Sequence, residues 1–158
     1  MVSPNEPGWL VRAQNPGRVI FGKEGDLKGE TKVFVALIIQ TDGSKSNSSF
    51  LAEAKRSKSF NDNTTRYKNQ KVQTQQITDK GTRCLKYVGS VQDTQSKAVA
   101  SGPQYIKNSG YVCRHPLRKD IAVDMSYSNR STARTLSAAE RNLVKQFFAN
   151  VQFNNNGF

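Results

Sequence analysis

The hydrophobic pattern of the chain predicts two buried strands. Residues 33–40 are an almost unbroken apolar run rich in β-branched types, which is typical of a strand buried on both faces. Residues 121–127 alternate instead, and this alternation predicts a strand whose odd-numbered positions point inward. Asp124 and Ser126 are then expected to point to solvent.

Helical spacing occurs in two places. Residues 137–140 read Ser-Ala-Ala-Glu, which is a capping-box sequence, and apolar residues at core spacing follow from Leu143 to Phe148. Val151 and Phe153 are expected to continue this packing. A second helix is expected over residues 50–59, with Ser48 or Ser49 as its N-cap.

The remaining elements are short strands and turns. Residues 9–21 indicate a hairpin around Pro16-Gly17, and residues 70–92 indicate another around positions 78–81. Residues 93–109 are polar and are expected to be irregular, and a short strand is expected at 111–114. The resulting order of strands, helix, four strands and helix predicts an α+β fold with a mainly antiparallel sheet flanked by helices.

The length of 158 residues is that of one domain. We expect a flexible leader over residues 1–8, a single α+β domain over 9–153 and a flexible tail over 154–158. No apolar stretch approaches the roughly 20 residues that a membrane-spanning helix needs.

Charge is distributed unevenly along the chain. There are 24 Lys and Arg against 12 Asp and Glu, a net charge of +12, yet residues 1–44 are neutral. The excess lies in residues 45–86 and 105–145. Such a field attracts polyanions, namely nucleic acid, anionic lipid headgroups or acidic proteins, whereas the alternative is a solubilising surface of scattered cations.

The basic segments supply the candidate polyanion-binding residues. A tyrosine among them could stack on a base while its neighbours contact phosphates, although no known nucleic-acid-binding motif is present. The candidates are Lys55, Arg56, Lys58, Arg66, Tyr67, Lys68, Lys71, Arg114, Arg118 and Lys119.

The two cysteines, Cys84 and Cys113, both lie in strand-like sequence. This context favours a disulfide between neighbouring strands, and the alternative is two unrelated buried thiols. With His115 as the single histidine, a zinc site would have too few soft ligands, so no metal is expected.

The sequence offers few arrangements of residues that could be catalytic. Cys113 and His115 are two residues apart, so on a strand they would face the same way, as a thiol nucleophile and its base would require. Against this reading, Pro116 follows the histidine and Cys84 is an evident partner for the cysteine. There is no Gly-x-Ser-x-Gly elbow, no supported acid pair and no phosphate cradle. We therefore expect no catalytic residue, no enzyme activity and no cofactor.

Several short motifs carry a family resemblance. They are the Cys84-x-x-Tyr87 strand, the segment from Gly110 to Pro116, the strand end at 126–130, and a closing helix that runs into Phe153. Together they resemble small exported bacterial proteins of uncharacterised function, often lipoproteins. The order of elements is also similar to that of the photosystem subunit PsbP and the Ran-binding protein Mog1. These resemblances imply an exported protein with a binding or accessory role.

The polar, Pro- and Gly-containing start after Met1 is typical of the mature portion of an exported protein. We expect a periplasmic or lipid-anchored location at the bacterial envelope. The leading hypothesis is a non-enzymatic exported envelope accessory or partner-binding protein that uses a basic surface, its partner an unknown protein or an anionic envelope component. The alternatives are a polyanion- or nucleic-acid-binding module and a hydrolase built on a thiol and a histidine.

Overall fold

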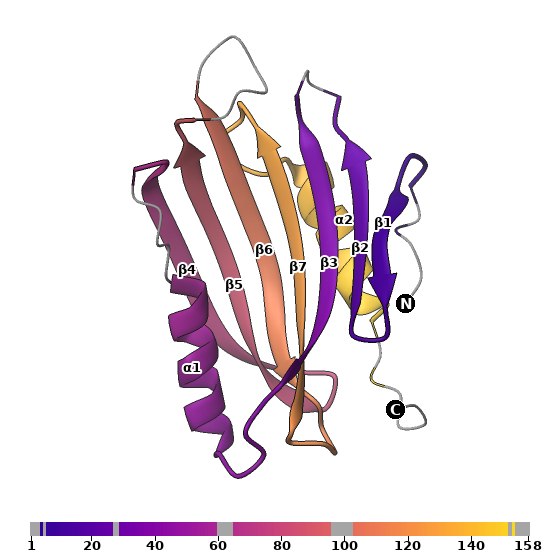
Figure 1. Ribbon diagram of the computed structural model, residues 1–158, viewed down its shortest axis with the longest axis vertical. Helices are drawn as coiled ribbons and strands as arrows, with labels where there is room; N and C mark the ends of the chain where they lie inside the picture. The colour runs from indigo at the N-terminus through magenta and orange to yellow at the C-terminus, as the bar shows by residue number, and fades with distance from the viewer. Residues whose placement is uncertain are drawn as a thin grey trace.

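A computed structural model describes residues 4, 6–26, 29–59, 65–95, 103–151 and 153 of the chain. Within these residues it forms a seven-stranded sheet with two helices (Figure 1). Every strand pairing is antiparallel, and the strand order is β1-β2-β3-β7-β6-β5-β4. The predicted α+β class with a mainly antiparallel sheet flanked by helices is therefore confirmed.

The elements follow the predicted order along the chain. The strands are β1 (Leu10–Asn15), β2 (Arg18–Glu24), β3 (Thr31–Gln40), β4 (Tyr67–Asp79), β5 (Thr82–Asp93), β6 (Gln104–Arg114) and β7 (Ile121–Ser131). The helices are α1 (Asn47–Ser59) and α2 (Ala138–Ala149).

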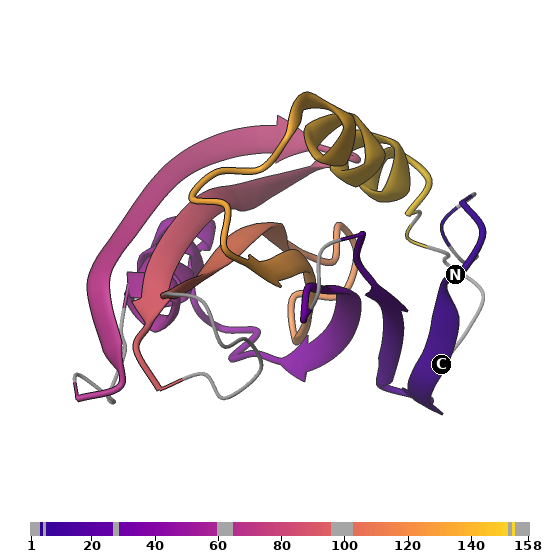
Figure 2. The same ribbon diagram turned by 90° about the horizontal axis from the view of Figure 1, so that it is seen from above.

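The two helices cover opposite faces of the sheet (Figure 2). On the face we call the α2 face, α2 packs against side chains that include Phe34, Cys113 and Tyr127. On the opposite α1 face, α1 packs against Leu85 and its neighbours on β5, β6 and β7. Because side chains alternate along each strand, every strand contributes to both faces.

The α2 face is centred on an aromatic cluster. Phe34 on β3 is fully buried, and its ring stacks on that of Phe147 at a centroid distance of 4.0 Å. The rings of Tyr127 and Trp9 lie 4.8 and 5.0 Å from it. The capping box at the start of α2 is formed as predicted, with the Ser137 hydroxyl accepting from the Glu140 backbone N–H.

The closing segment also behaves as predicted. Val151 is buried in the α2-face core, and Phe153 packs against that core. At the same end of the molecule, Lys80 Nζ donates to the carbonyl oxygen of Ala149 at 3.1 Å, so the β4–β5 turn is fastened to the C-terminus of α2. This contact places a cation where the helix dipole is negative.

Three local predictions are wrong. Strand β6 begins at Gln104 rather than near 111, because its first half carries polar residues on both faces and so looks like loop sequence. Helix α1 begins at Asn47, and Ser46 caps it, since the backbone N–H of Ser49 donates to Ser46 Oγ at 3.1 Å. Asp124 lies beneath α1, where it forms an ion pair with Lys58, instead of pointing to solvent.

Residues 33–40 were predicted to form a strand buried on both faces, and this is confirmed on one face only. Phe34 and Ala36 are buried on the α2 face, whereas Val35 and Leu37 on the other face are only partly buried. The segment 93–109 was expected to be irregular, and this is wrong for residues 104–109, which form the start of β6. Residues 96–102 of that segment, residues 1–3 and 5 of the expected leader, and the whole expected tail lie outside the described residues.

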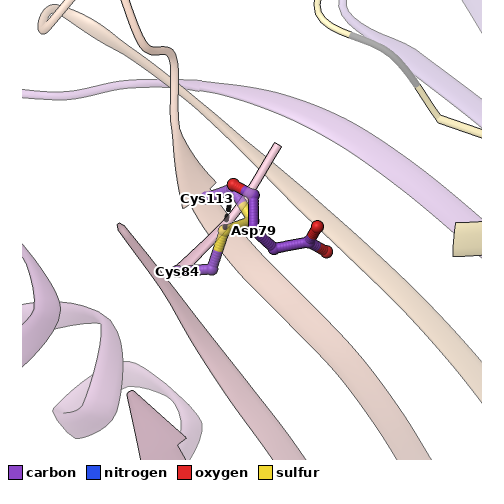
Figure 3. Close-up of a disulfide and its surroundings, with 3 residues drawn as sticks. All are labelled: Asp79, Cys84 and Cys113. Atoms are coloured by element: carbon purple, nitrogen blue, oxygen red, sulfur yellow. Dashed lines mark hydrogen bonds between the residues drawn. A yellow bond between two sulfur atoms is a disulfide. The ribbon is translucent and has the colours of Figure 1, made fainter. Parts of the chain in front are cut away.

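Cys84 and Cys113 lie directly opposite each other on β5 and β6, with their Cα atoms 4.2 Å apart and their sulfur atoms joined (Figure 3). The pairing predicted from strand context is the pairing observed. The bridge is buried in the α2-face core, and the carbonyl oxygen of Asp79 lies 3.9 Å from Cys84 Sγ.

Arg114 ends β6 as a buried cation, with 2% of its surface exposed. Its guanidinium donates to the carbonyl oxygens of Lys119, Lys45 and Asp42 at 2.7–2.8 Å, and to Asn47 Oδ1 at 3.2 Å. Only the planar fork of an arginine can reach all of these acceptors at once. Arg114 thus fastens the entry to α1 onto the β6–β7 connection.

Removing the disulfide should weaken the fold. Replacing Cys84 and Cys113 together by alanine opens a cross-link between residues 29 apart in sequence. The free energy of unfolding should fall by about 3–4 kcal/mol in the chain-entropy description, measured by urea denaturation. Wild-type protein unfolded under reducing conditions is the control and should give the same midpoint. A loss below about 1 kcal/mol would contradict this account.

Substituting Arg114 by lysine should destabilise the protein although the charge is kept. A lysine cannot reproduce the fork, so the substitution should lower the free energy of unfolding by about 2–3 kcal/mol. The matched control is Arg118→Lys, because Arg118 is an exposed residue paired with Asp120 at 2.9 Å. That control should change stability by less than about 0.5 kcal/mol. Equal urea midpoints for the two variants would show that Arg114 is not an anchor.

Candidate anion-binding groove

A groove of about 390 Å³ lies where α2 leaves the α2 face uncovered. One wall is formed by β4, β5 and β6, and the other by residues 134–136 and the outer side of α2. We call it the basic groove; its lining residues are Lys71, Gln73, Lys86, Val88, Gly89, Ser90, Lys107, Asn108, Ser109, Tyr111, Arg134, Thr135, Leu136, Arg141, Val144 and Lys145.

The lining of the basic groove has one sign of charge. Six of its residues are cations and none is Asp or Glu. Antiparallel register sets Lys71 opposite Ser90 and Ser90 opposite Lys107, so the two lysines lie in one row across β4, β5 and β6. On the other wall, Arg141 and Lys145 are one helical turn apart on α2 and therefore share a side of it.

Lys107 is the most buried of these cations, with 3% of its surface exposed. Its Nζ donates to Ser131 Oγ at 2.5 Å. Burial lowers the pKa of Lys107, and the charges of Glu140 and Glu30 offset part of that shift. The ammonium is thus desolvated at the groove wall and is held by a neutral hydroxyl.

Of the other groove cations, Arg134 lies over the ring of Tyr105 at 5.5 Å, and the remaining four are weakly engaged. In the part of the chain that the structure describes, neither a hydrogen bond nor an ion pair involves the side chains of Lys71, Lys86 and Lys145. Arg141 donates to the carbonyl oxygen of Leu136 at 2.5 Å, which keeps a positive charge beside the residues that link β7 to α2. An anion entering the groove would therefore meet positive charge that no acidic lining residue neutralises.

Apolar surface accompanies this charge. Val88 on β5 is 45% exposed, which makes it one of four large hydrophobic side chains that are exposed among the described residues. Leu136 and Val144 lie on the opposite wall. The aliphatic stems of lysines add to this surface.

Among the residues nominated from the sequence for polyanion binding, Lys71 alone lines the groove. Lys55, Arg56 and Lys58 belong to α1, which packs on the opposite face. The ammonium of Lys58 is also occupied, because it pairs with Asp124 and lies over the ring of Tyr87 at 4.7 Å.

A second nominated group lies at the start of β4. Arg66 makes two hydrogen bonds with the buried carboxylate of Asp93, at 2.9 and 2.8 Å, and these hold the pKa of Asp93 below its usual range. The Arg66 guanidinium also lies 5.1 Å from the ring centre of Tyr67. The neighbouring Lys68 is exposed.

The third nominated group lies around the β6–β7 connection. Arg114 is buried as described above, Arg118 pairs with Asp120, and Lys119 is exposed and supplies its carbonyl oxygen to Arg114. The nominated residues are thus divided among α1, the start of β4 and this connection, and the structure does not gather them into one site.

Sequence reasoning missed most of the groove cations. These are Lys86, Lys107, Arg134, Arg141 and Lys145. A signal was available for Lys86, because it alternates with the apolar residues Leu85 and Tyr87 along β5. The strand register is needed to show that they converge.

The thiol and histidine considered for catalysis are both engaged. The sulfur of Cys113 is bonded to that of Cys84. The ring of His115 is buried, its Nδ1 accepts from the backbone N–H groups of Leu117 and Arg118 at 3.2 and 3.0 Å, and it packs edge-on against Phe153.

The described ranges contain no group of three or more His, Cys, Asp or Glu side chains placed to hold a metal ion. Neither of their helices has the length and apolar character needed to cross a membrane. Comparison of the chain with protein-family models and with curated proteins gave no match.

Proposed function

We propose that this protein is a non-enzymatic binding protein that holds an anionic ligand or partner in the basic groove. The observation that carries this proposal is a concave site lined by six cations and by no acidic residue, with the buried Lys107 among them. Pockets of roughly 300–1,000 Å³ with a few converging polar groups are where small ligands usually bind.

The energetics of the groove support a binding role. Like charges gathered on low-dielectric walls repel each other, and a buried ammonium is unfavourable unless its charge is compensated. The charges of Glu140 and Glu30 compensate that of Lys107 only in part. An arrangement that disfavours the free fold is expected where a ligand supplies the missing countercharge. A cation that served only solubility would stay solvated, as Lys55 is on α1 and Lys71 is in the groove, whereas Lys107 is buried.

The proposed setting is the bacterial envelope, where the protein would be exported as a periplasmic or lipid-anchored accessory. The Cys84–Cys113 bridge supports this, because disulfides persist in oxidising compartments. The order of elements, with three strands before α1 and four before α2, is the basis for a PsbP/Mog1-like arrangement. Free thiols at Cys84 and Cys113 in natively sourced protein would argue against export.

The alternatives are favoured less by the same observations. Nucleic-acid binding without sequence specificity generally combines cations with rings on which bases stack. The single aromatic residue lining the groove is Tyr111, and its ring packs edge-on against Phe148 at 5.0 Å. A hydrolase built on Cys113 and His115 would first require reduction of the disulfide.

Removing groove charge should weaken anion binding. The test variant is Lys86→Gln combined with Lys145→Gln, and citrate is the probe, measured by isothermal titration calorimetry at low salt. Loss of two cations should reduce affinity at least about tenfold, and added salt should weaken wild-type binding. The matched control is Lys55→Gln with Arg56→Gln, which removes the same charge from α1.

Equal loss in the two double variants would mean that net charge alone attracts the anion, and the proposed site would be wrong. A single-stranded DNA probe that bound tightly and kept its affinity in the groove variant would place nucleic-acid binding on another surface and would also contradict the proposal.

A further inference from the structure

We propose that the basic groove selects an amphipathic monoanion, an alkyl carboxylate whose head binds at Lys107 and whose chain lies along Val88, Leu136 and Val144. This inference rests on the proposed function and specifies its ligand class. It follows from the apolar side chains that line the groove among its cations.

The head-binding end is built around Lys107. An ammonium has three N–H donors, and Ser131 Oγ accepts the one hydrogen bond that Nζ makes among the described residues. Ser131 ends β7, and the chain continues from there into residues 134–136 of the opposite groove wall. The Arg134 guanidinium of that wall lies 5.5 Å from the ring centre of Tyr105, which is two residues from Lys107 on the same face of β6. Arg134 therefore lies at the head-binding end, and a carboxylate there can accept from both side chains.

The apolar stretch begins in the adjacent row of the sheet. Ser90, which faces Lys107, and Val88 are two residues apart on β5, so their Cα atoms are about 7 Å apart along the strand. Both point to the α2 face, because side chains on a strand alternate. Leu136 and Val144 line the opposite wall, so a chain leaving the head-binding end would have apolar side chains on both sides.

Other anions fit this mixed lining of cations and apolar side chains less well. A compact polyanion would pair with the cations but would leave Val88 exposed to water. An alkyl chain would instead cover Val88 and the lysine stems, and burial of apolar surface adds to affinity in proportion to its area. The groove therefore matches a ligand that carries one anionic group and an extended apolar part.

The first experiment compares ligands on the wild-type protein. Calorimetry with monomeric dodecanoate should give saturable binding of one ligand per chain. Acetate supplies the head without the chain, and dodecyltrimethylammonium supplies the chain with the opposite charge. We expect both to bind at least about a hundredfold more weakly than dodecanoate, since acetate lacks the apolar chain and dodecyltrimethylammonium lacks the negative charge.

The second experiment uses paired variants. Lys107→Met keeps the length and apolar stem of the side chain but removes its charge, and Val88→Asn removes apolar surface from an exposed position. Each should lower the affinity for dodecanoate about tenfold. Lys55→Met and Val11→Asn make the same changes at exposed positions outside the groove and should leave affinity unchanged. Val88→Asn keeps the test informative even if Lys107→Met fails to fold.

The outcomes separate this inference from the proposed function. If dodecanoate binds no better than acetate while citrate binding still depends on Lys86 and Lys145, the amphipathic ligand class is wrong and the anion-binding groove stands. If neither dodecanoate nor citrate binds, both proposals fail. Binding that appears only with dodecanoate micelles or anionic vesicles, or that survives both groove variants, would also overturn the inference.

Discussion

The packing of α2 on Phe34 is the interaction on which the rest of the molecule depends. Phe34 lies on β3 with no exposed surface, and its ring contacts the rings of Trp9, Tyr127, Phe147 and Phe148. These contacts join the first strands, the central β7 and the C-terminal helix in one core. The capping box that starts α2 uses Glu140, whose carboxylate also accepts from the Tyr127 hydroxyl at 2.9 Å. Helix initiation and helix docking are therefore linked.

A single helix cannot cover the whole of that face. An α-helix with its side chains is about 10 Å wide, whereas seven strands spaced about 4.8 Å apart extend over roughly 29 Å. Because the aromatic cluster holds α2 over the first strands and β7, the β4–β5 side of the same face stays open except near the β4–β5 turn, where Lys80 contacts Ala149. Helix α1 supports β4 and β5 from the other side. The basic groove is the part of the α2 face that remains, and this explains why polar sequence in β4, β5 and β6 coexists with well-formed strands.

Two buried cations illustrate the difference between stabilising the fold and preparing a site. Arg114 is satisfied by three backbone carbonyl oxygens and an amide oxygen, and it connects segments far apart in sequence. Lys107 has one hydroxyl partner and a pKa lowered by burial. The first arrangement satisfies the charge of Arg114 within the protein. The second gives Lys107 a single hydrogen-bond acceptor beside the partly compensating charges of Glu140 and Glu30, and we propose that a ligand supplies the rest. For this reason the proposed anion site is at Lys107, although the sequence nominated Arg114.

The order of elements, the antiparallel class, the α2 capping box and the Cys84–Cys113 pairing could all be predicted from the sequence, because each depends on local spacing or on strand context. The start of β6, the Ser46 cap and the burial of Asp124 could not be predicted. Each of these depends on the packing of another element. A polar residue in a strand is predicted to lie in a loop or to face solvent when the element that packs against it is unknown. The same limit applied to the candidate site: composition showed that the later chain is basic, but only strand register and the place of α2 brought Lys71, Lys107 and Lys145 together. The alternation of side chains shows which residues share a face of a strand, but it does not show which face another element leaves uncovered.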